Sequence, residues 1–342
     1  MSVASPGTAP TTAAATATVD ESVELAVYER SGFIESRHAG SAVVLDGVTA
    51  EPLLRLGNPD APVFPRSAMK PFQAIAIMSS GVELSGQQAA IATASHTGSA
   101  GHVTLVRQLL DRAGLNSDAL ECPADWPTDK AMRNELVLSN MGADPVYMNC
   151  SGKHAAMLLA CVQNDWPTVG YLDPAHPLQK RVREIVERFT GDKVIATGID
   201  GCGAPVHAMS LVALARGIRG VSAASIDSPF AMLRGAASLR AAVLTNPWVA
   251  SGHGEPDTAI VEKLGIFAKI GAEGVMVLST SDGTTAALKI LDGNLRVAAI
   301  VALQLLVRVG ALSQAKVDEV APLLDLTVLG GGKPVGVLRA TI

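Results

Sequence analysis

The sequence predicts an α+β fold in which strands from both ends of the chain form one antiparallel sheet and the middle forms an inserted helical lobe. Three observations support this prediction. Short segments of β character follow one another between residues 23 and 46, helical periodicity dominates the central part, and β character returns from residue 275. Since the first and last strands of an antiparallel sheet can be neighbours, the helical middle is expected to leave the sheet and return to it.

We divide the 342-residue chain into a tail and one folded unit. Residues 1–20 are rich in Ala, Thr, Ser and Pro, with neither a basic start nor an apolar run of signal-peptide length, and are expected to be disordered. Residues 21–342 are expected to form a single unit. Its sheet lobe would comprise residues 21–66 and about 265–342, and its helical lobe about 67–264.

The first strands are expected at residues 23–29, 33–36 and 41–46. The turn residues Arg30-Ser31-Gly32 and Ala39-Gly40 separate them, which is typical of a meander. Residues 47–66 contain four prolines and a Gly-Asn-Pro-Asp turn, and we therefore expect a loop there.

The helical middle is expected to begin at residue 67. Pro71 falls in the first turn of the expected helix 67–80, where a proline is tolerated, and Gly81 ends this helix. Further helices are expected at residues 87–93, 103–113 and 177–189.

The C-terminal part carries a strong hairpin signal. Residues 275–280 and 284–291 read as strands, and Ser281-Asp282-Gly283 lies between them. A second turn leads into an expected helix at residues 295–309.

Composition excludes several classes of protein. The net charge of −5, without a run of Lys or Arg, argues against a nucleic-acid partner, and an aromatic content of 4% argues against base stacking. No stretch approaches the ~20 apolar residues that a membrane span needs. The four cysteines are expected to be reduced, since a large aliphatic core needs no disulfide. We therefore expect a cytoplasmic protein with neither a nucleic-acid nor a membrane partner.

Ser67 and Lys70 form a Ser-x-x-Lys pair at the start of the first expected helix. Residues three apart on a helix share a face, about 5–6 Å apart at Cβ, and the helix N-terminus favours developing negative charge. A lysine buried in an apolar helix loses solvation, which favours the neutral amine and so provides a base for the serine. The alternative is chance, because a bare Ser-x-x-Lys occurs roughly once in a chain of this composition.

Three further segments concentrate polar and reactive side chains. They are Ala94-Ser95-His96, Asn149-Cys150-Ser151-Gly152-Lys153-His154 and Asp200-Gly201-Cys202-Gly203. Each has a structural explanation: a helix C-cap, a helix N-cap with Ser151 as the capping residue, and a tight turn, in that order. Caps and turns alone do not easily explain all of these segments in one chain.

Together these segments and Lys269-Ile270-Gly271-Ala272-Glu273-Gly274 resemble the type II, rhizobial-type L-asparaginase family. The resemblance runs from about residue 23 to 340, in the same order and with similar spacing. That family is related in architecture to the serine β-lactamases and penicillin-binding proteins, which share a Ser-x-x-Lys helix start and a strand-borne lysine near the C-terminus. The resemblance therefore implies a serine β-lactamase-like form of the predicted α+β fold.

The resemblance implies roles for individual residues. Ser67 matches the nucleophile and Lys70 its base, while Ser95 and Lys269 match a second Ser-Lys pair that would relay protons. Three residues match substrate-contacting positions of the family: Arg66, His154 and Asp200. An arginine suits a substrate α-carboxylate and an aspartate suits an α-ammonium group. Lys269 is chosen over Lys263 because Gly271 follows it and a strand is expected soon after.

The resemblance also implies a zinc site. Cys150, Lys153 and Cys202 match its ligands, although lysine lies outside the ordinary Cys, His and carboxylate set. The ion is not expected to carry the acyl-transfer chemistry. The alternative is a pair of buried thiols beside a charged residue. Gly330-Gly331-Gly332-Lys333 is rejected as a phosphate loop, because Pro334 stands where Ser or Thr is required.

The implied activity is hydrolysis of the side-chain amide of L-asparagine to L-aspartate and ammonia through a seryl acyl-enzyme. Two alternatives remain open at this point. One is another serine amidase or esterase, or a β-lactam-interacting hydrolase, on the same scaffold. The other is a catalytically silent zinc- or amino-acid-binding protein. We expect L-asparagine as the small-molecule partner and a homodimer as the assembled form.

Overall fold

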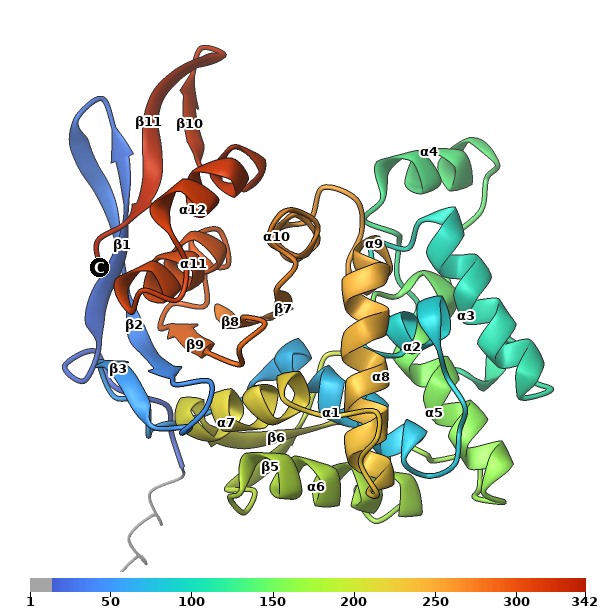
Figure 1. Ribbon diagram of the computed structural model, residues 1–342. Coiled ribbons are helices and arrows are strands. Elements are labelled where there is room, and N and C mark those ends of the chain that lie inside the picture. Colours follow the sequence, from blue (N-terminus) through green and yellow to red (C-terminus); the bar gives the residue numbers. More distant parts are fainter. Residues whose placement is uncertain (1–13) are drawn as a thin grey trace, which may run out of the picture.

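The N-terminal segment leads directly into the sheet. The computed structural model describes residues 14–342 (Figure 1), so most of the expected disordered tail lies outside the described residues. Residues 14–20 include neither helix nor strand, and the backbone N–H of Thr18 donates to the carboxylate of Glu21. Within residues 14–342, none of the helices has the length and apolar character needed to cross a bilayer.

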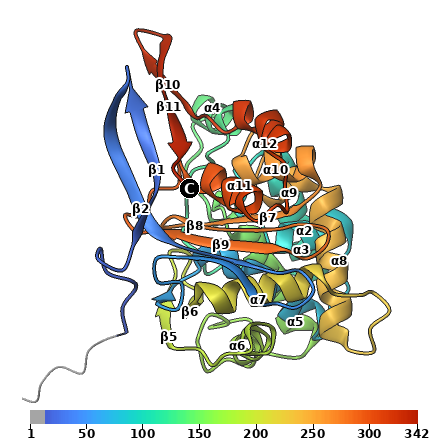
Figure 2. The same ribbon diagram turned by 60° about the vertical axis from the view of Figure 1, so that its left-hand side comes forward.

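Strands from both ends of the chain form the main sheet, as the sequence predicts. The strands are β1 (Val23–Arg30), β2 (Phe33–Leu45), β3 (Pro52–Leu56), β7 (Phe267–Gly271), β8 (Val275–Ser279), β9 (Thr285–Ile290), β10 (Thr327–Gly330) and β11 (Lys333–Ala340). Their order is β10-β11-β1-β2-β9-β8-β7, with β3 also paired to β2, and every pairing is antiparallel. The expected α+β class and the expected hairpin between β8 and β9 are therefore confirmed. The β1–β2 and β10–β11 hairpins lie side by side (Figures 1 and 2).

The turn expected at Ala39-Gly40 is wrong, because β2 continues without interruption through both residues. Gly40 marks the point where β2 exchanges partners: Val23 of β1 pairs with it on one side and Ile290 of β9 on the other. A Cβ added to Gly40 would lie 2.1 Å from the carbonyl oxygen of Lys289. This glycine therefore permits the close approach of two backbones rather than a turn.

Residues 47–66 do not form the expected continuous loop. Strand β3 pairs along the second half of β2, and the short β4 (Pro62–Val63) joins β6 (Pro205–Ser210) and β5 (Ala196–Ile199) in a small second sheet that sequence reasoning missed. Proline is tolerated at the first position of a strand, which is where Pro52 and Pro62 stand. The prolines thus mark strand starts as well as turns.

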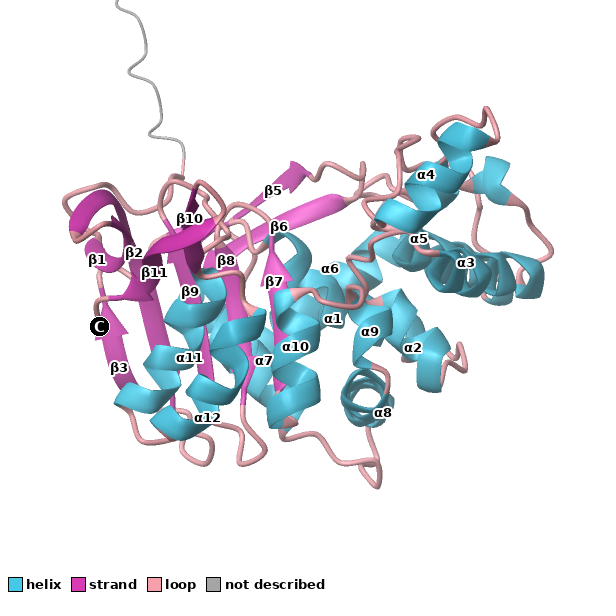
Figure 3. Cartoon of the chain, turned by 90° about the horizontal axis from the view of Figure 1, so that it is seen from above, coloured by secondary structure: helices cyan, strands magenta, loops and turns pink. Residues whose placement is uncertain are grey.

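The middle of the chain is helical, as predicted. Its helices are α1 (Lys70–Met78), α2 (Gly86–Ala92), α3 (Ala100–Arg112), α4 (Lys130–Leu138), α5 (Ser151–Gln163), α6 (Pro177–Thr190), α7 (Leu211–Ser222), α8 (Ala231–Thr245), α9 (Pro247–Ala250) and α10 (Pro256–Leu264). Helices α11 (Ala298–Arg308) and α12 (Gln314–Val320) follow the hairpin, and 3₁₀ turns are found at η1 (Arg66–Met69), η2 (Ser117–Ala119), η3 (Pro145–Tyr147) and η4 (Ala321–Leu323). Seen from above, the strands gather on one side and α2–α5 on the other (Figure 3).

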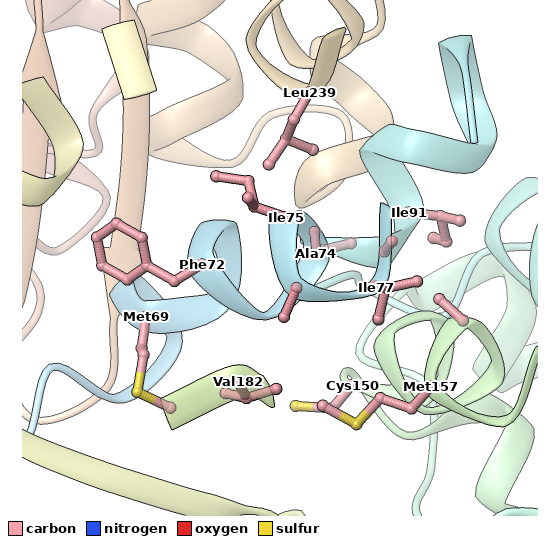
Figure 4. Close-up of a cluster of buried hydrophobic side chains, with 14 of the residues drawn as sticks. Met69, Phe72, Ala74, Ile75, Ile77, Ile91, Cys150, Met157, Val182 and Leu239 are labelled. Atoms are coloured by element: carbon pink, nitrogen blue, oxygen red, sulfur yellow. The ribbon is translucent and has the colours of Figure 1, made fainter. Parts of the chain in front are cut away.

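Two apolar cores flank the sheet. Successive residues of β8 alternate between them: Val277 belongs to the core shared with the helical lobe, and Met276 and Leu278 belong to the core under α11. Helix α1 lies in the first core, surrounded by other helices and buried from Lys70 to Ile77 (Figure 4). Lys70, the first residue of this buried helix, is therefore shielded from solvent.

Candidate functional site

The turn that carries Ser67 is a 3₁₀ turn, η1, and the α-helix begins only at Lys70. The expected helix 67–80 therefore needs a correction at its start. Pro71 occupies the first or second position of α1, where its missing N–H costs nothing. Arg66 opens the turn with a φ of +51°, a left-handed conformation that is uncommon for a residue with a side chain. Ser67 itself is half-buried.

Ser95, not Ser67, is the serine that both buried lysines contact. Lys70 Nζ donates to Ser95 Oγ at 2.8 Å and to the carbonyl oxygen of Ala94. Lys269 Nζ lies 3.3 Å from the same Oγ and donates also to the carbonyl oxygen of Ile270. Each lysine is 1% exposed. The expected Ser95–Lys269 pair is therefore present, and Lys70 joins it.

Strand β7 brings Lys269 against the turn that carries Ser67. A Cβ added to Gly271 would lie 2.4 Å from the carbonyl oxygen of Pro65 and 3.2 Å from the amide nitrogen of Ala68. Only glycine fits this contact without displacing β7 from η1. Lys263, the alternative that the sequence offered, is exposed in the last turn of α10.

Burial shifts the proton equilibrium of Lys269. Loss of water around the amine lowers its pKa to about 8, with the carboxylate of Asp257 opposing the shift and the charge of Lys70 adding to it. Asp257 Oδ2 lies 3.8 Å from Lys269 Nζ, and its side chain is 3% exposed. A lysine with this pKa exchanges protons close to neutral pH.

Two of the three sequence-predicted substrate residues form an ion pair. Arg66 Nε donates to Asp200 Oδ1 at 2.8 Å, and Arg66 Nη1 lies 3.8 Å from Glu273 Oε1. Burial raises the pKa of Asp200, but the hydrogen bonds from Arg66 and from the backbone N–H of Gly201 lower it by more, so the pKa is lowered overall. A pocket of about 310 Å³ adjoins Arg66 on the side of Phe64.

His154 lies on α5 next to Lys153, whose charge acts on Asp200. Its Nδ1 is 2.7 Å from the hydroxyl oxygen of Tyr171, and burial lowers its pKa to about 4. The imidazole is therefore neutral at physiological pH. Its Nε2 is buried, and the Cys202 thiol beside the ring partly opposes the lowering of the His154 pKa.

The three expected metal ligands are brought together. Lys153 Nζ donates to Cys202 Sγ at 3.0 Å, and the Cys150 thiol, which donates to Asn149 Oδ1, lies close enough to Cys202 for each thiol to shift the pKa of the other. All four cysteines of the chain are free thiols, so no disulfide joins the pair. Interaction with Cys202 lowers the pKa of Cys150 well below its usual value, against the effect of burial. Burial would lower the pKa of Lys153, but Cys202 and Cys150 raise it.

This donor set fits a zinc ion in kind. The buried thiols of Cys150 and Cys202 are ordinary zinc ligands, and Lys153 beside Cys202 would add a nitrogen from outside the ordinary ligand set. Among residues 14–342 no group of three or more His, Cys, Asp or Glu side chains is placed to hold a metal, so a metal at this position would require Lys153 as a ligand.

Two of the segments singled out by the sequence are held together by His96. Its Nε2 lies 3.0 Å from Ser151 Oγ, and its backbone N–H donates to the carbonyl oxygen of Asn149. Ser151 is not the helix cap that its position suggested; its hydroxyl donates to the carbonyl oxygen of Val146, and Cys150 is the N-cap residue of α5.

Sequence reasoning missed Asp257. It follows Pro256 in the first turn of α10, where an acidic residue is ordinary, so no local signal distinguishes it. Only its 2% exposure and its place opposite Lys269 reveal it.

The comparison with known proteins agrees with these segments. A family model described as L-asparaginase II matches residues 26–340, nearly the whole chain. Among proteins with curated descriptions, none matches.

Proposed function

Because the chain belongs to the L-asparaginase II family, we propose that it hydrolyses the side-chain amide of L-asparagine to L-aspartate and ammonia. One observation carries the mechanism: Ser95 Oγ accepts hydrogen bonds from the buried amines of Lys70 and Lys269, and Lys70 stands three residues after Ser67. A binding protein has no use for two buried amines on one hydroxyl.

In the first step, Ser67 Oγ forms a bond to the carboxamide carbon and its proton passes to Lys70. The two amines and Ser95 Oγ act as one proton reservoir, since each amine contacts the same oxygen. Lys70 passes its resting proton through Ser95 to a neutral Lys269 and is then free to accept the proton from Ser67. Backbone N–H groups would stabilise the oxyanion, at a few kcal/mol per donor.

In the second step, the C–N bond breaks and the stored proton returns through Ser95 to the leaving nitrogen. Ammonia departs and leaves an ester on Ser67. Water then hydrolyses the ester to L-aspartate and restores the hydroxyl. The two lysine amines together carry one ionising proton before the attack, two after it and one again at the end of the cycle, so protons balance.

Ser95 is the second candidate for the nucleophile. Its hydroxyl already contacts both amines, whereas the nearest lysine to Ser67 in sequence, Lys70, donates elsewhere. We retain Ser67 because η1 packs directly against the Lys269 strand through Gly271 and because family resemblance matches it to the nucleophile.

We propose that Arg66 and Asp200 bind the substrate's α-carboxylate and α-ammonium groups. Their mutual ion pair supports this role, because a zwitterionic ligand can replace each partner with a charge of the same sign. His154 would contribute a neutral hydrogen bond from the interior.

The proposed scaffold is serine β-lactamase-like and forms a single unit with a sheet lobe and a helical lobe. It is supported by the pairing of terminal strands and by a strand-borne lysine beside a Ser-x-x-Lys turn.

Cys150, Lys153 and Cys202 would hold one zinc ion. Bound there, zinc would supply a fixed positive charge near the substrate-binding groups, outside the acyl transfer. For the assembled protein we propose a homodimer.

Ammonia release from L-Asn, L-Gln and D-Asn tests the proposal, with zinc content measured on the same sample. Release from L-Asn well above the other two supports an asparaginase. Preference for L-Gln, or for esters and β-lactams in a parallel panel, would indicate another serine hydrolase on this scaffold. No turnover together with saturable binding of L-Asn would indicate a silent binding protein.

A further inference from the structure

Asp257 is a buried carboxylate that the proposed mechanism does not yet use. Its Oδ2 accepts a hydrogen bond from Ser251 Oγ at 2.8 Å and faces Lys269 Nζ at 3.8 Å, while Oδ1 accepts from the backbone N–H of Thr258. Each oxygen of the Asp257 carboxylate thus accepts a hydrogen bond from a group other than Lys269. A buried charge needs such partners.

The segment that carries Ser251 also fixes the backbone of Ser95. The N–H of Ser95 donates to the carbonyl oxygen of Ala250 at 2.9 Å, and the N–H of Thr97 donates to that of Ser251 at 2.8 Å. Gly252, at φ +151°, completes the contact, since an added Cβ would lie 2.7 Å from Thr97 Cγ2. The same short segment therefore sets the position of Ser95 and, through Asp257, that of Lys269.

We propose that Asp257 is a positioning residue for the amide hydrolysis: held by Ser251, its carboxylate keeps the Lys269 amine against Ser95 and able to take up the second proton of the reservoir. This inference rests on the proposed function. It adds a residue that contacts neither the substrate nor the scissile bond.

Three titratable groups act on the Lys269 amine in addition to burial: Asp257, Lys70 and Cys150. Burial lowers its pKa most; Asp257 raises it, Lys70 lowers it and Cys150 raises it. When Ser67 gives up its proton, two ammonium groups must lie on either side of Ser95 Oγ. The carboxylate of Asp257 compensates the second charge, and without it the reservoir would be a much weaker base.

The central experiment is Asp257→Asn, read through the pKa of Lys269. NMR titration of protein labelled with [¹⁵N]lysine, assigned with Lys269→Gln, reports this pKa without substrate. Loss of the carboxylate should lower it by about 1 to 3 units. The acid limb of the kcat profile should move to lower pH by the same amount, the plateau kcat should fall about tenfold or more, and KM should change little.

Two variants control for a structural role. Asp257→Glu keeps the charge and should restore much of the kcat and the pKa. Glu255→Gln removes a half-buried carboxylate from the same end of α10 and should leave kcat and the pKa of Lys269 unchanged. If Asp257→Asn does not fold, Ser251→Ala replaces it, with kcat expected to fall about tenfold at unchanged KM.

A Lys269 pKa that stays the same in Asp257→Asn overturns the proposal, even if activity falls, because the residue would then only stabilise α10. An unchanged kcat in Ser251→Ala overturns it likewise. Absence of ammonia release by the wild-type enzyme would overturn the proposed function alone, since the NMR titration still measures the coupling between Asp257 and Lys269.

Discussion

Ser95 Oγ is the atom on which both buried amines converge, although Ser67 is the proposed nucleophile. The two serines can be distinguished by substitution. Ser67→Ala should lower kcat by ~10³-fold or more and leave no covalent adduct in intact-protein mass spectra after rapid quenching with L-Asn. Ser95→Ala should lower kcat by a similar order but still form an ester on Ser67.

Ser85→Ala is the matched control, because Ser85 is exposed ahead of α2 and its side chain caps nothing there. Its activity should equal that of the wild type. An adduct that maps to Ser95 in the wild type and persists in Ser67→Ala would reverse the assignment.

The pH dependence follows from Lys269. Its amine must be neutral at the start of the cycle to receive a proton, and burial lowers its pKa to about 8. Below this pH the amine is protonated and the reservoir is full, so kcat should rise with pH through about 8 and then level off. A kcat profile measured with saturating L-Asn from pH 6 to 9.5 tests this, and a flat profile would exclude Lys269 as the controlling group.

Much of the site could be predicted at the residue scale because its side chains stand in short, unusual segments. Lys153 and Cys202 meet as expected, as do Ser95 and Lys269. The contact between Lys70 and Ser95 could not be predicted, because it depends on how α1 packs against the end of α2. Asp257 was missed for the same reason: an acid in the first turn of a helix has no local mark of function.

At the element scale, alternation and helical periodicity predicted β1, β2, β8 and β9 and helices α1, α2, α3, α6 and α11, but not β10 or β11, the strand that pairs with β1. Turn chemistry was less reliable. Gly40 reads as a turn but lies in the middle of β2, because a glycine that admits a neighbouring backbone leaves the same local signal as one in a turn. In the small β4–β6–β5 sheet, β5 and β6 form a local hairpin, whereas β4 lies too far from β6 in sequence for any local pattern to pair them.

Gly271 allows a test of the contact between β7 and η1. In Gly271→Ala the new Cβ would meet the carbonyl oxygen of Pro65 at 2.4 Å, so β7 must move away from the turn that carries Ser67. We expect kcat to fall by about 10- to 100-fold and the free energy of unfolding by about 1–3 kcal/mol. Steady-state kinetics and urea denaturation measure the two effects.

Gly142→Ala is the control for this substitution, since its Cβ would meet open space and its φ is not left-handed. It should behave as the wild type in both measurements. Full activity in Gly271→Ala would mean that the distance between Lys269 and Ser67 does not govern catalysis.

At the scale of the whole molecule, the two ends of the chain complete one sheet. Ala26 of β1 pairs with Ala340 of β11, so the last strand ends beside the first. The chain leaves this sheet after β3 and returns to it at β7, and the site lies where Lys70 and Ser95 of the helical part meet Lys269 of the sheet. The proposed chemistry therefore depends on how the lobes meet and not on either lobe alone.

This topology predicts that the chain tolerates circular permutation. A linker of about six residues from residue 342 to residue 23 would span the short gap between β11 and β1. New termini between Ile226 and Asp227 would open an exposed loop between α7 and α8, remote in sequence from every proposed site residue. The permutant should fold and retain kcat within a few fold, because each strand keeps its partners.

The matched control opens the same joined chain at Gly40. There the break would fall where β2 passes from β1 to β9, and both halves of the strand would lose their continuity within the sheet. We expect this permutant to be insoluble or inactive, as measured by circular dichroism and ammonia release. Should the Gly40 permutant be as active as the loop permutant, the continuity of β2 would not be what holds the two ends of the chain in one sheet, and the site would have to be assembled by the helical lobe and β7 alone.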